Sequence, residues 1–265
     1  MAHNKARYYT DKTIKRLFAL SGNECAFPSC SKQLVNEENA LDSNICHIEA
    51  ASEGGERYNP EMTDKERADY PNLILLCPQH HAKTDDVTVY TIETLQQMKK
   101  NHESFILNSK MKANPSMLKN AINAISNIEL DDFYEGNISN SFNLQEKIKY
   151  NSIKRNNALI QEYKVYHKKI NSLYDELERQ GSIKKVRLLN TVKHLYTKTK
   201  GKYILDKKND IEVIRENSDQ IIEDIFDALY SEMENSNFFD EDIILGIRLI
   251  MIDAFMRCKI LEEPK

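Results

Sequence analysis

The sequence lacks tryptophan, contains only 7 glycines and 6 prolines, and carries no excess of positive charge. Its formal net charge of -4 argues against a globally basic nucleic-acid scaffold, so any attraction to phosphate must be local or come from a partner. Scarce glycine, with abundant Leu, Ile, Lys, Glu and Asn in the second half, is typical of helices. A chain of 265 residues can form one large domain or two ordinary ones.

Long apolar segments are also missing. Residues 1–16 are polar and charged, which predicts that no signal segment is present. The longest apolar run, residues 243–255, is too short to span a bilayer and contains Arg248 and Asp253. We therefore expect a cytoplasmic protein without a membrane span, and in that compartment cysteines more often bind metal than form disulfides.

The few cysteines are the most informative residues, because most of them lie in the first third of the chain. Cys25 and Cys30 are separated by four residues, and Cys77 shortly precedes two adjacent histidines. Two distant pairs of soft ligands are typical of one tetrahedral zinc site that ties a long loop, although ordinary buried cysteines are an alternative. The predicted ligands of this structural zinc are Cys25, Cys30, Cys77 and His80. His80 is preferred to His81 because its spacing places it on the same knuckle as Cys77.

Other polar residues of this region predict a second, catalytic site. His81 and Asp85 are four residues apart, so on a helix they share a face and can bind one divalent cation, Mg²⁺ or Mn²⁺. His47 would lie on a neighbouring strand, where a neutral imidazole can deprotonate water. Asn72 could accept a hydrogen bond from one ring nitrogen of His47 and so fix its orientation. A metal beside such a base suits phosphodiester hydrolysis. Taken singly, His47 and Asn72 are better explained as polar groups that pin loops, but the constellation as a whole favours catalysis.

Residues 25–103 resemble an HNH endonuclease of the ββα-metal class, in the variety stabilised by a zinc knuckle. The resemblance is carried by Cys25 and Cys30, Cys46-His47-Ile48, Pro71-Asn72-Leu73, the run Leu76 to His81, and the nine-residue step from Asn72 to His81. It implies that His47 is the general base, that Asn72 orients it, and that His81 binds the catalytic metal. Members of this family mostly cut double-stranded DNA.

The chain departs from the family at Cys46. Members often carry Asp or His directly before the base as a second metal ligand, and a thiol is a poor ligand for Mg²⁺. Asp85 is therefore the expected replacement, unless Cys46 favours a softer ion. Candidate phosphate contacts are the local basic residues Lys12, Lys15, Arg16, Arg57, Lys83, Lys99 and Lys100, although each could be an ordinary solvated charge.

The second half of the chain reads as an all-helical domain. Residues 109–143 form a candidate linker rich in Asn and Ser, although a helix is possible at 117–125. Helices are expected around 159–177, after Gly181, and at 211–233 and 241–261, with apolar residues repeating every three or four positions. The last is apolar nearly all round, so it must be buried in the bundle or against another chain.

The predicted fold class is therefore α+β. It consists of a small zinc-stapled ββα-metal nuclease domain at residues 1–108, a linker at 109–143 and an all-α bundle at 144–265. Nothing in the bundle has catalytic spacing, and such a module is typical of interaction or assembly domains.

Residues 144–265 are also similar to the C-terminal domain of effector subunits in bacterial ABC-three-component (Lamassu-like) anti-phage systems. This similarity is carried by Lys147, Tyr150-Asn151, Glu162 to Lys164, Tyr174 to Leu177 and Gln180-Gly181. It implies that an SMC-like ATPase and a small middle subunit hold the nuclease inactive. Sensing of invading DNA would release it, with assembly of a homo-oligomer as a possible step.

Three functions are compatible with these patterns. The first is a metal-dependent endonuclease acting on double-stranded DNA under control of such partners. The second is a zinc-ribbon DNA-binding or adaptor protein whose nuclease site is vestigial, which Cys46 favours. The third is a stand-alone restriction endonuclease acting on modified DNA.

Overall fold

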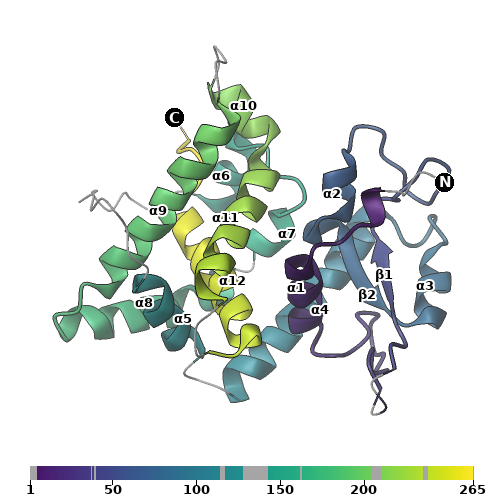
Figure 1. Ribbon diagram of the computed structural model, residues 1–265, viewed down its shortest axis with the longest axis horizontal. Coiled ribbons are helices and arrows are strands. Elements are labelled where there is room, and N and C mark those ends of the chain that lie inside the picture. The colour runs from purple at the N-terminus through teal and green to yellow at the C-terminus, as the bar shows by residue number, and fades with distance from the viewer. Residues whose placement is uncertain are drawn as a thin grey trace. The chain divides into compact units, whose positions relative to one another are not determined.

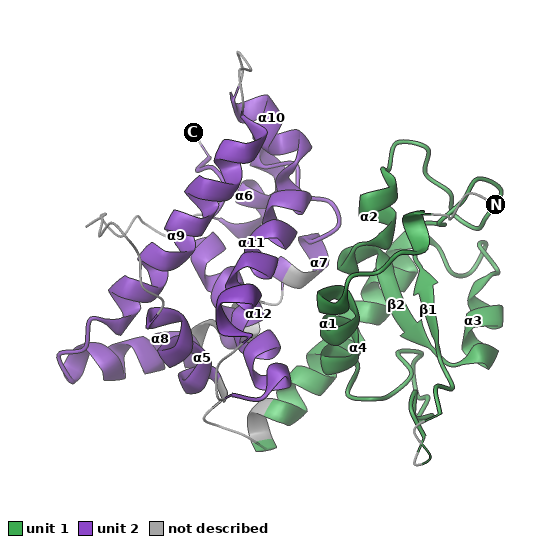
Figure 2. Cartoon of the chain, viewed as in Figure 1, with its two compact units in different colours: residues 1–113 green, residues 114–265 purple. Residues whose placement is uncertain are grey.

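A computed structural model describes residues 5–36, 38, 40–113, 117–127, 143–161, 163–204, 210–234 and 238–264. The chain divides into two compact units, residues 1–113 and 114–265 (Figure 2). The first unit ends at Ala113, whereas the predicted nuclease domain ended at residue 108. Within the described ranges a single two-stranded sheet accompanies the helices, which agrees with the α+β prediction (Figure 1). None of the helices in those ranges is both long and apolar enough to cross a bilayer.

Unit 1 contains the sheet and the residues predicted to bind metal or to act in catalysis. Its elements are η1 (Lys5–Arg7), α1 (Asp11–Ser21), β1 (Asn44–His47), α2 (Asp64–Ala68), η2 (Tyr70–Asn72), β2 (Leu73–Leu76), α3 (Pro78–Thr84) and α4 (Ile92–Ala113). β1 and β2 are antiparallel, with Asn44 opposite Leu76 and His47 opposite Leu73. α3 begins directly after β2, with Pro78 in its first turn, where a missing N–H costs nothing. The three elements form a ββα arrangement.

The predicted first helix has the expected ends. Thr10 caps α1 by accepting a hydrogen bond from the backbone N–H of Thr13 at 3.1 Å. Gly22 ends the helix at a φ of 60°, which glycine adopts without steric cost. A Cβ at Gly22 would lie 2.6 Å from Cδ1 of Ile106, so α4 packs directly against the end of α1.

The buried face of α4 differs in part from its prediction. Leu95 and Met98 are buried as expected, but Phe105 is 61% exposed and Ile106 is buried in its place. Ile106 follows Leu95 by eleven residues, about three helical turns, so it returns to the same face. Phe105 lies about a quarter-turn away from that face.

Unit 2 is built around one central helix. Its elements are α5 (Met117–Ser126), α6 (Leu144–Tyr150), α7 (Asn157–Ile160), α8 (Tyr163–Arg179), α9 (Lys184–Tyr203), α10 (Asp210–Glu216), α11 (Ser218–Met233) and α12 (Asp240–Met256). α12 contacts α5, α8, α9 and α11, and its residues 243–256 are all buried. The apolar C-terminal helix is therefore covered within its own unit and needs no second chain.

Two charged side chains within this core, Asp253 and Lys147, are hydrogen-bonded. Asp253 on α12 accepts hydrogen bonds from the hydroxyl of Tyr174 and from Nε of Arg257, both at 2.9 Å. The fully buried ammonium of Lys147 donates to the carbonyl of Phe255 at the end of α12. These bonds offset the cost of removing charges from water, and they link α6, α8 and α12.

The expected linker is partly a core helix. Residues 117–126 form α5, whose apolar side chains Leu118, Ala121, Ile122 and Ile125 are buried, and α5 contacts α12. The three- and four-residue spacing of these apolar groups outweighs the scattered Asn and Ser that suggested a linker. The rest of that segment, residues 128–142, lies outside the described residues.

The helix expected at 211–233 is two helices, α10 and α11, which meet at Asn217. The side chain of Asn217 donates to the carbonyl of Val213 at 2.8 Å, so it competes with the backbone for a helical acceptor. The final helix ends at Met256 rather than at residue 261.

Candidate functional site

Four Cys and His side chains come together beside the sheet. The ligand atoms of Cys25, Cys30, Cys77 and His80 all lie within 4.8 Å of one another. Nδ1 of His80 is 3.2 Å from Sγ of Cys77 and 3.6 Å from Sγ of Cys25. This group can hold a metal ion, and three thiols with one imidazole are a donor set that tetrahedral zinc accepts. The structure thus brings together the four residues that the sequence predicted.

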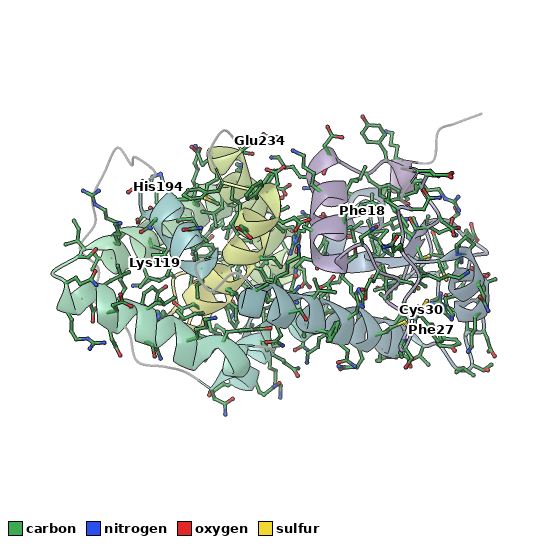
Figure 3. The ribbon with its side chains drawn as sticks, turned by 90° about the horizontal axis from the view of Figure 1, so that it is seen from below. Phe18, Phe27, Cys30, Lys119, His194 and Glu234 are labelled. Atoms are coloured by element: carbon green, nitrogen blue, oxygen red, sulfur yellow. The ribbon has the colours of Figure 1, made fainter. Side chains whose placement is uncertain are left out.

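Neighbouring groups hold this cluster in place. The ring of Phe27 stacks on the imidazole of His80, with centroids 3.9 Å apart and planes within 3° (Figure 3 labels Phe27 and Cys30). The backbone N–H of Cys77 donates to Sγ of Cys25 at 3.3 Å. Burial raises the pKa of Cys25 to about 12, so a cation must displace a proton to bind this thiol.

A cavity of about 240 Å³ lies against β1 and α3. Among the groups that line it are Cys46 and His47 from β1, His81 from α3, Asp85 at the C-terminal end of α3, and Arg57. Asn72 does not line it. The ββα arrangement therefore presents His47, His81 and Asp85 to one space, as the sequence led us to expect.

His47 is held by the backbone of the N-terminal segment. Its Nε2 lies 3.0 Å from the carbonyl oxygen of Ala6 in η1, which can only accept a hydrogen bond. Nε2 is therefore the protonated nitrogen of the neutral ring, which leaves the lone pair on Nδ1. Burial lowers the pKa of His47 from its ordinary value of 6.5. The imidazole is consequently neutral at pH 7 and can accept a proton.

The expected hydrogen bond between the Asn72 side chain and the His47 ring is not formed. The buried amide of Asn72 donates to the carbonyls of Glu49 at 2.9 Å and Arg67 at 3.0 Å. Its Oδ1 accepts the backbone N–H of Glu49 at 2.9 Å. Both ends of the amide are used by backbone, because Asn72 lies between the loop after β1 and the end of α2. It ties these two segments together.

His81 and Asp85 are adjacent, as their spacing predicted. Nδ1 of His81 is 3.6 Å from Oδ1 of Asp85, and both side chains are partly exposed at the cavity. Across the described ranges, the Cys25 cluster is the group in which three or more possible ligands converge. His81 and Asp85 therefore offer a nitrogen and an oxygen donor without a third close protein ligand.

Cys46 lies on the same cavity but is not a charged donor. Its buried Sγ donates to the carbonyl of Asn44 at 3.4 Å. Burial, followed by the charge of Asp85, raises the pKa of Cys46 to about 12. The thiol therefore stays neutral at pH 7, which makes it a weak ligand for hard cations.

Two arginines that bind loop carbonyls were not recognised in this role from the sequence. Nε of Arg57 donates to Ile48 at 2.7 Å, and its Nη1 donates to Thr84 at 3.0 Å and Tyr90 at 3.1 Å. Arg67 similarly donates to three carbonyls in the loop between β1 and α2. Arg57 had been expected to contact phosphate, but these bonds give it a structural role. The sequence feature that could have predicted this role is the nearby loop rich in Gly and polar residues, because its backbone carbonyls need hydrogen-bond donors.

Two more candidate phosphate contacts are buried. The guanidinium carbon of Arg16 and Nζ of Lys99 each lie 3.7 Å from the ring centroid of Tyr70. Lys99 also forms an ion pair of 2.8 Å with Glu103. These two cations belong to the interior of unit 1, so neither is available to DNA.

Comparison with known proteins concerns unit 2. A family model described as C-terminal domain 10 of the ABC-three component (ABC-3C) systems matches residues 116–262, which is more than half of the chain. Unit 1 lies outside the matched segment. No curated protein and no solved structure matches the chain.

Proposed function

Because the chain belongs to the family defined by C-terminal domain 10 of the ABC-three component systems, we propose that it is the DNA-cutting effector of such a system. Unit 1 would be a metal-dependent endonuclease acting on double-stranded DNA in the cytoplasm. The observation that carries this proposal is the shared cavity, where a neutral, oriented His47 faces the same space as His81 and Asp85.

The chain's own residues suit phosphodiester hydrolysis. Nδ1 of His47 would take a proton from water as the water oxygen bonds to phosphorus, while the bond from phosphorus to the leaving oxygen breaks. His81 and Asp85 would hold a divalent cation, Mg²⁺ or Mn²⁺, whose charge stabilises the leaving oxygen. Arg57 lines the cavity and donates hydrogen bonds to the carbonyls of Ile48 and Thr84. It thereby fixes the backbone next to His47 and Asp85.

The Cys25 cluster would hold a structural zinc. Its ligands come from the turn after α1 and from the start of α3, so zinc would fix α3 against the knuckle. In this proposal zinc sets the position of His81, which follows His80 directly.

Unit 2 would connect the nuclease to its partners. Its family supports membership of a multi-component complex over a stand-alone restriction enzyme. We expect an SMC-like ATPase and a small middle subunit, as in Lamassu-like anti-phage systems, to restrain the nuclease until DNA is sensed. Release would allow the effector to form a homo-oligomer.

A second candidate is a zinc-containing DNA-binding or adaptor protein without nuclease activity. The observation in its favour is Cys46, a neutral thiol at the position where HNH nucleases often carry Asp or His as a metal ligand. The two candidates differ in whether cleavage depends on His47.

Plasmid cleavage in the presence of Mg²⁺ or Mn²⁺ tests the proposal. His47→Ala and Asp85→Asn should each lower the cleavage rate by roughly a hundredfold or more, because each removes one part of the catalytic apparatus. Asp86→Asn is the matched control, since Asp86 is adjacent to Asp85 but does not line the cavity. Zinc content and thermal unfolding should match the parent in all three variants.

Equal cleavage by His47→Ala and the parent would contradict the assignment of His47. DNA binding by a parent protein that cleaves under neither metal would favour the adaptor. Co-purification with an ATPase encoded in the same cell would support the multi-component assembly, and its absence would count against it.

A further inference from the structure

Positive charge in unit 2 is concentrated on one helix. α9 contains no acidic residue, and its basic residues are Lys184, Lys185, Arg187, Lys193, Lys198, Lys200 and Lys202. Its neighbour α11 shows the reverse, with five acidic residues and no basic one. In a chain with a net charge of -4, this segregation gives α9 a local positive potential that the overall composition hides.

The exposed side of α9 is basic along most of its length. The opposite side is buried against unit 2, through Leu188, Val192 and Leu195 among others. Arg187, His194, Lys198 and Lys202 are exposed and lie at spacings of seven, four and four residues, so they share one face, which we call the α9 stripe. The stripe extends over about 22 Å at 1.5 Å per residue. α9 lies along the side of unit 2 in Figure 1, and Figure 3 labels His194.

The lysines at the C-terminal half of the stripe are not used to stabilise unit 2. Lys184, Lys185 and Lys200 bind Asn123, Glu178 and Glu262 respectively. Within the part of the chain that the structure describes, the ammonium groups of Lys198 and Lys202 have no such partner. Lys198 and Lys202, at the C-terminal half of the stripe, are therefore available to an external anion.

We infer that the α9 stripe binds the phosphate backbone of double-stranded DNA. From residue 187 onward its exposed positions carry no large apolar side chain, whereas protein interfaces bury aromatic and apolar groups and are poor in lysine. Its exposed positions include no Phe, Tyr or Trp, and the imidazole of His194 is the one aromatic ring among them, which disfavours a stacking site for single strands. Exposed cations on one face of a helix can contact neighbouring phosphates of a duplex, and such contacts are independent of sequence.

This inference adds to the proposed function a way to retain DNA, and it does not require unit 1 to be a nuclease. Binding can be measured by fluorescence anisotropy of a labelled 30-base-pair duplex over a range of salt concentrations. The full chain is used with His47→Ala and without added Mg²⁺ or Mn²⁺, so that the DNA is not consumed whatever the role of His47. Failure of the nuclease proposal would appear as unchanged plasmid cleavage by His47→Ala and would leave this binding measurement intact.

The test variant is Lys198→Gln with Lys202→Gln, and the matched control is Lys149→Gln with Lys154→Gln. All four lysines are exposed, and the two pairs remove the same charge from unit 2. Loss of two phosphate contacts should weaken binding roughly 10- to 100-fold near 0.1 M salt and lower the slope of log K against log salt by about two. The control should bind like the parent.

Equal weakening in both pairs would show that only net charge matters and would overturn the inference. So would unchanged binding in the α9 pair. Far-UV circular dichroism and zinc content should be the same in all proteins.

Discussion

Unit 1 and unit 2 differ in what holds their interiors together. In unit 1 a two-stranded sheet is joined to irregular loops by a Cys/His cluster and by Arg57 and Arg67, whose guanidinium groups bind loop carbonyls. In unit 2 the centre is the apolar helix α12, which four other helices cover. The groups suited to catalysis lie on the short strand β1 and the short helix α3, next to these loops. This comparison indicates that polar ties position reactive side chains in unit 1, whereas unit 2 is stabilised mainly by apolar packing.

The largest expected effect comes from the Cys/His cluster. Cys77→Ser should release the metal and unfold unit 1, because a structural zinc contributes about 10–16 kcal/mol, as much as a whole domain's stability. Unit 2 should stay folded, since its core contains none of these ligands. Metal analysis, limited proteolysis and far-UV circular dichroism distinguish the two units. Cys258→Ser, in unit 2, is the control and should keep its metal. A metal-loaded, protease-resistant Cys77→Ser protein would contradict this view of unit 1.

The next effect concerns the apolar centre of unit 2. Ile247→Ala should lower the free energy of unfolding of unit 2 by about 2–5 kcal/mol, since Ile247 on α12 is fully buried. Ile183→Ala is the control, because Ile183 is 55% exposed and should change stability by less than about 0.5 kcal/mol. Urea unfolding monitored by circular dichroism measures both. If the two substitutions cost the same, packing around α12 is not what stabilises unit 2.

The smallest expected effect on stability comes from the hydrogen bonds of the Asn72 side chain. Asn72→Ala should lower the stability of unit 1 by about 2–3 kcal/mol, since buried backbone groups of Glu49 and Arg67 lose their partner. Asn101→Ala, on the exposed side of α4, should cost much less. The acidic limb of the pH–rate profile for cleavage should not move, because Asn72 does not touch His47. A shifted limb with unchanged stability would instead restore an orienting role for Asn72.

Local spacing explains which features could be predicted from the sequence. The Cys/His cluster, the pairing of His81 with Asp85, and the capping of α1 by Thr10 each depend on residues within a few positions or on a strong chemical preference. The orientation of Asn72 could not be predicted, because an amide binds side chains and backbone equally well. The burial of Arg16 and Lys99 likewise depends on Tyr70, which is distant in sequence. The partners and the burial of these side chains are determined by the tertiary fold.

The hydrogen bond from His47 to Ala6 has a consequence for how this site can be studied. The acceptor is a main-chain carbonyl, which every amino acid at position 6 would supply. Substitution of side chains one at a time would therefore affect position 6 only through its tight packing. It would not reveal the hydrogen bond between the Ala6 carbonyl and the His47 imidazole. Chemical editing of the main chain, such as exchanging the amide that follows Ala6 for an ester, reaches that atom directly.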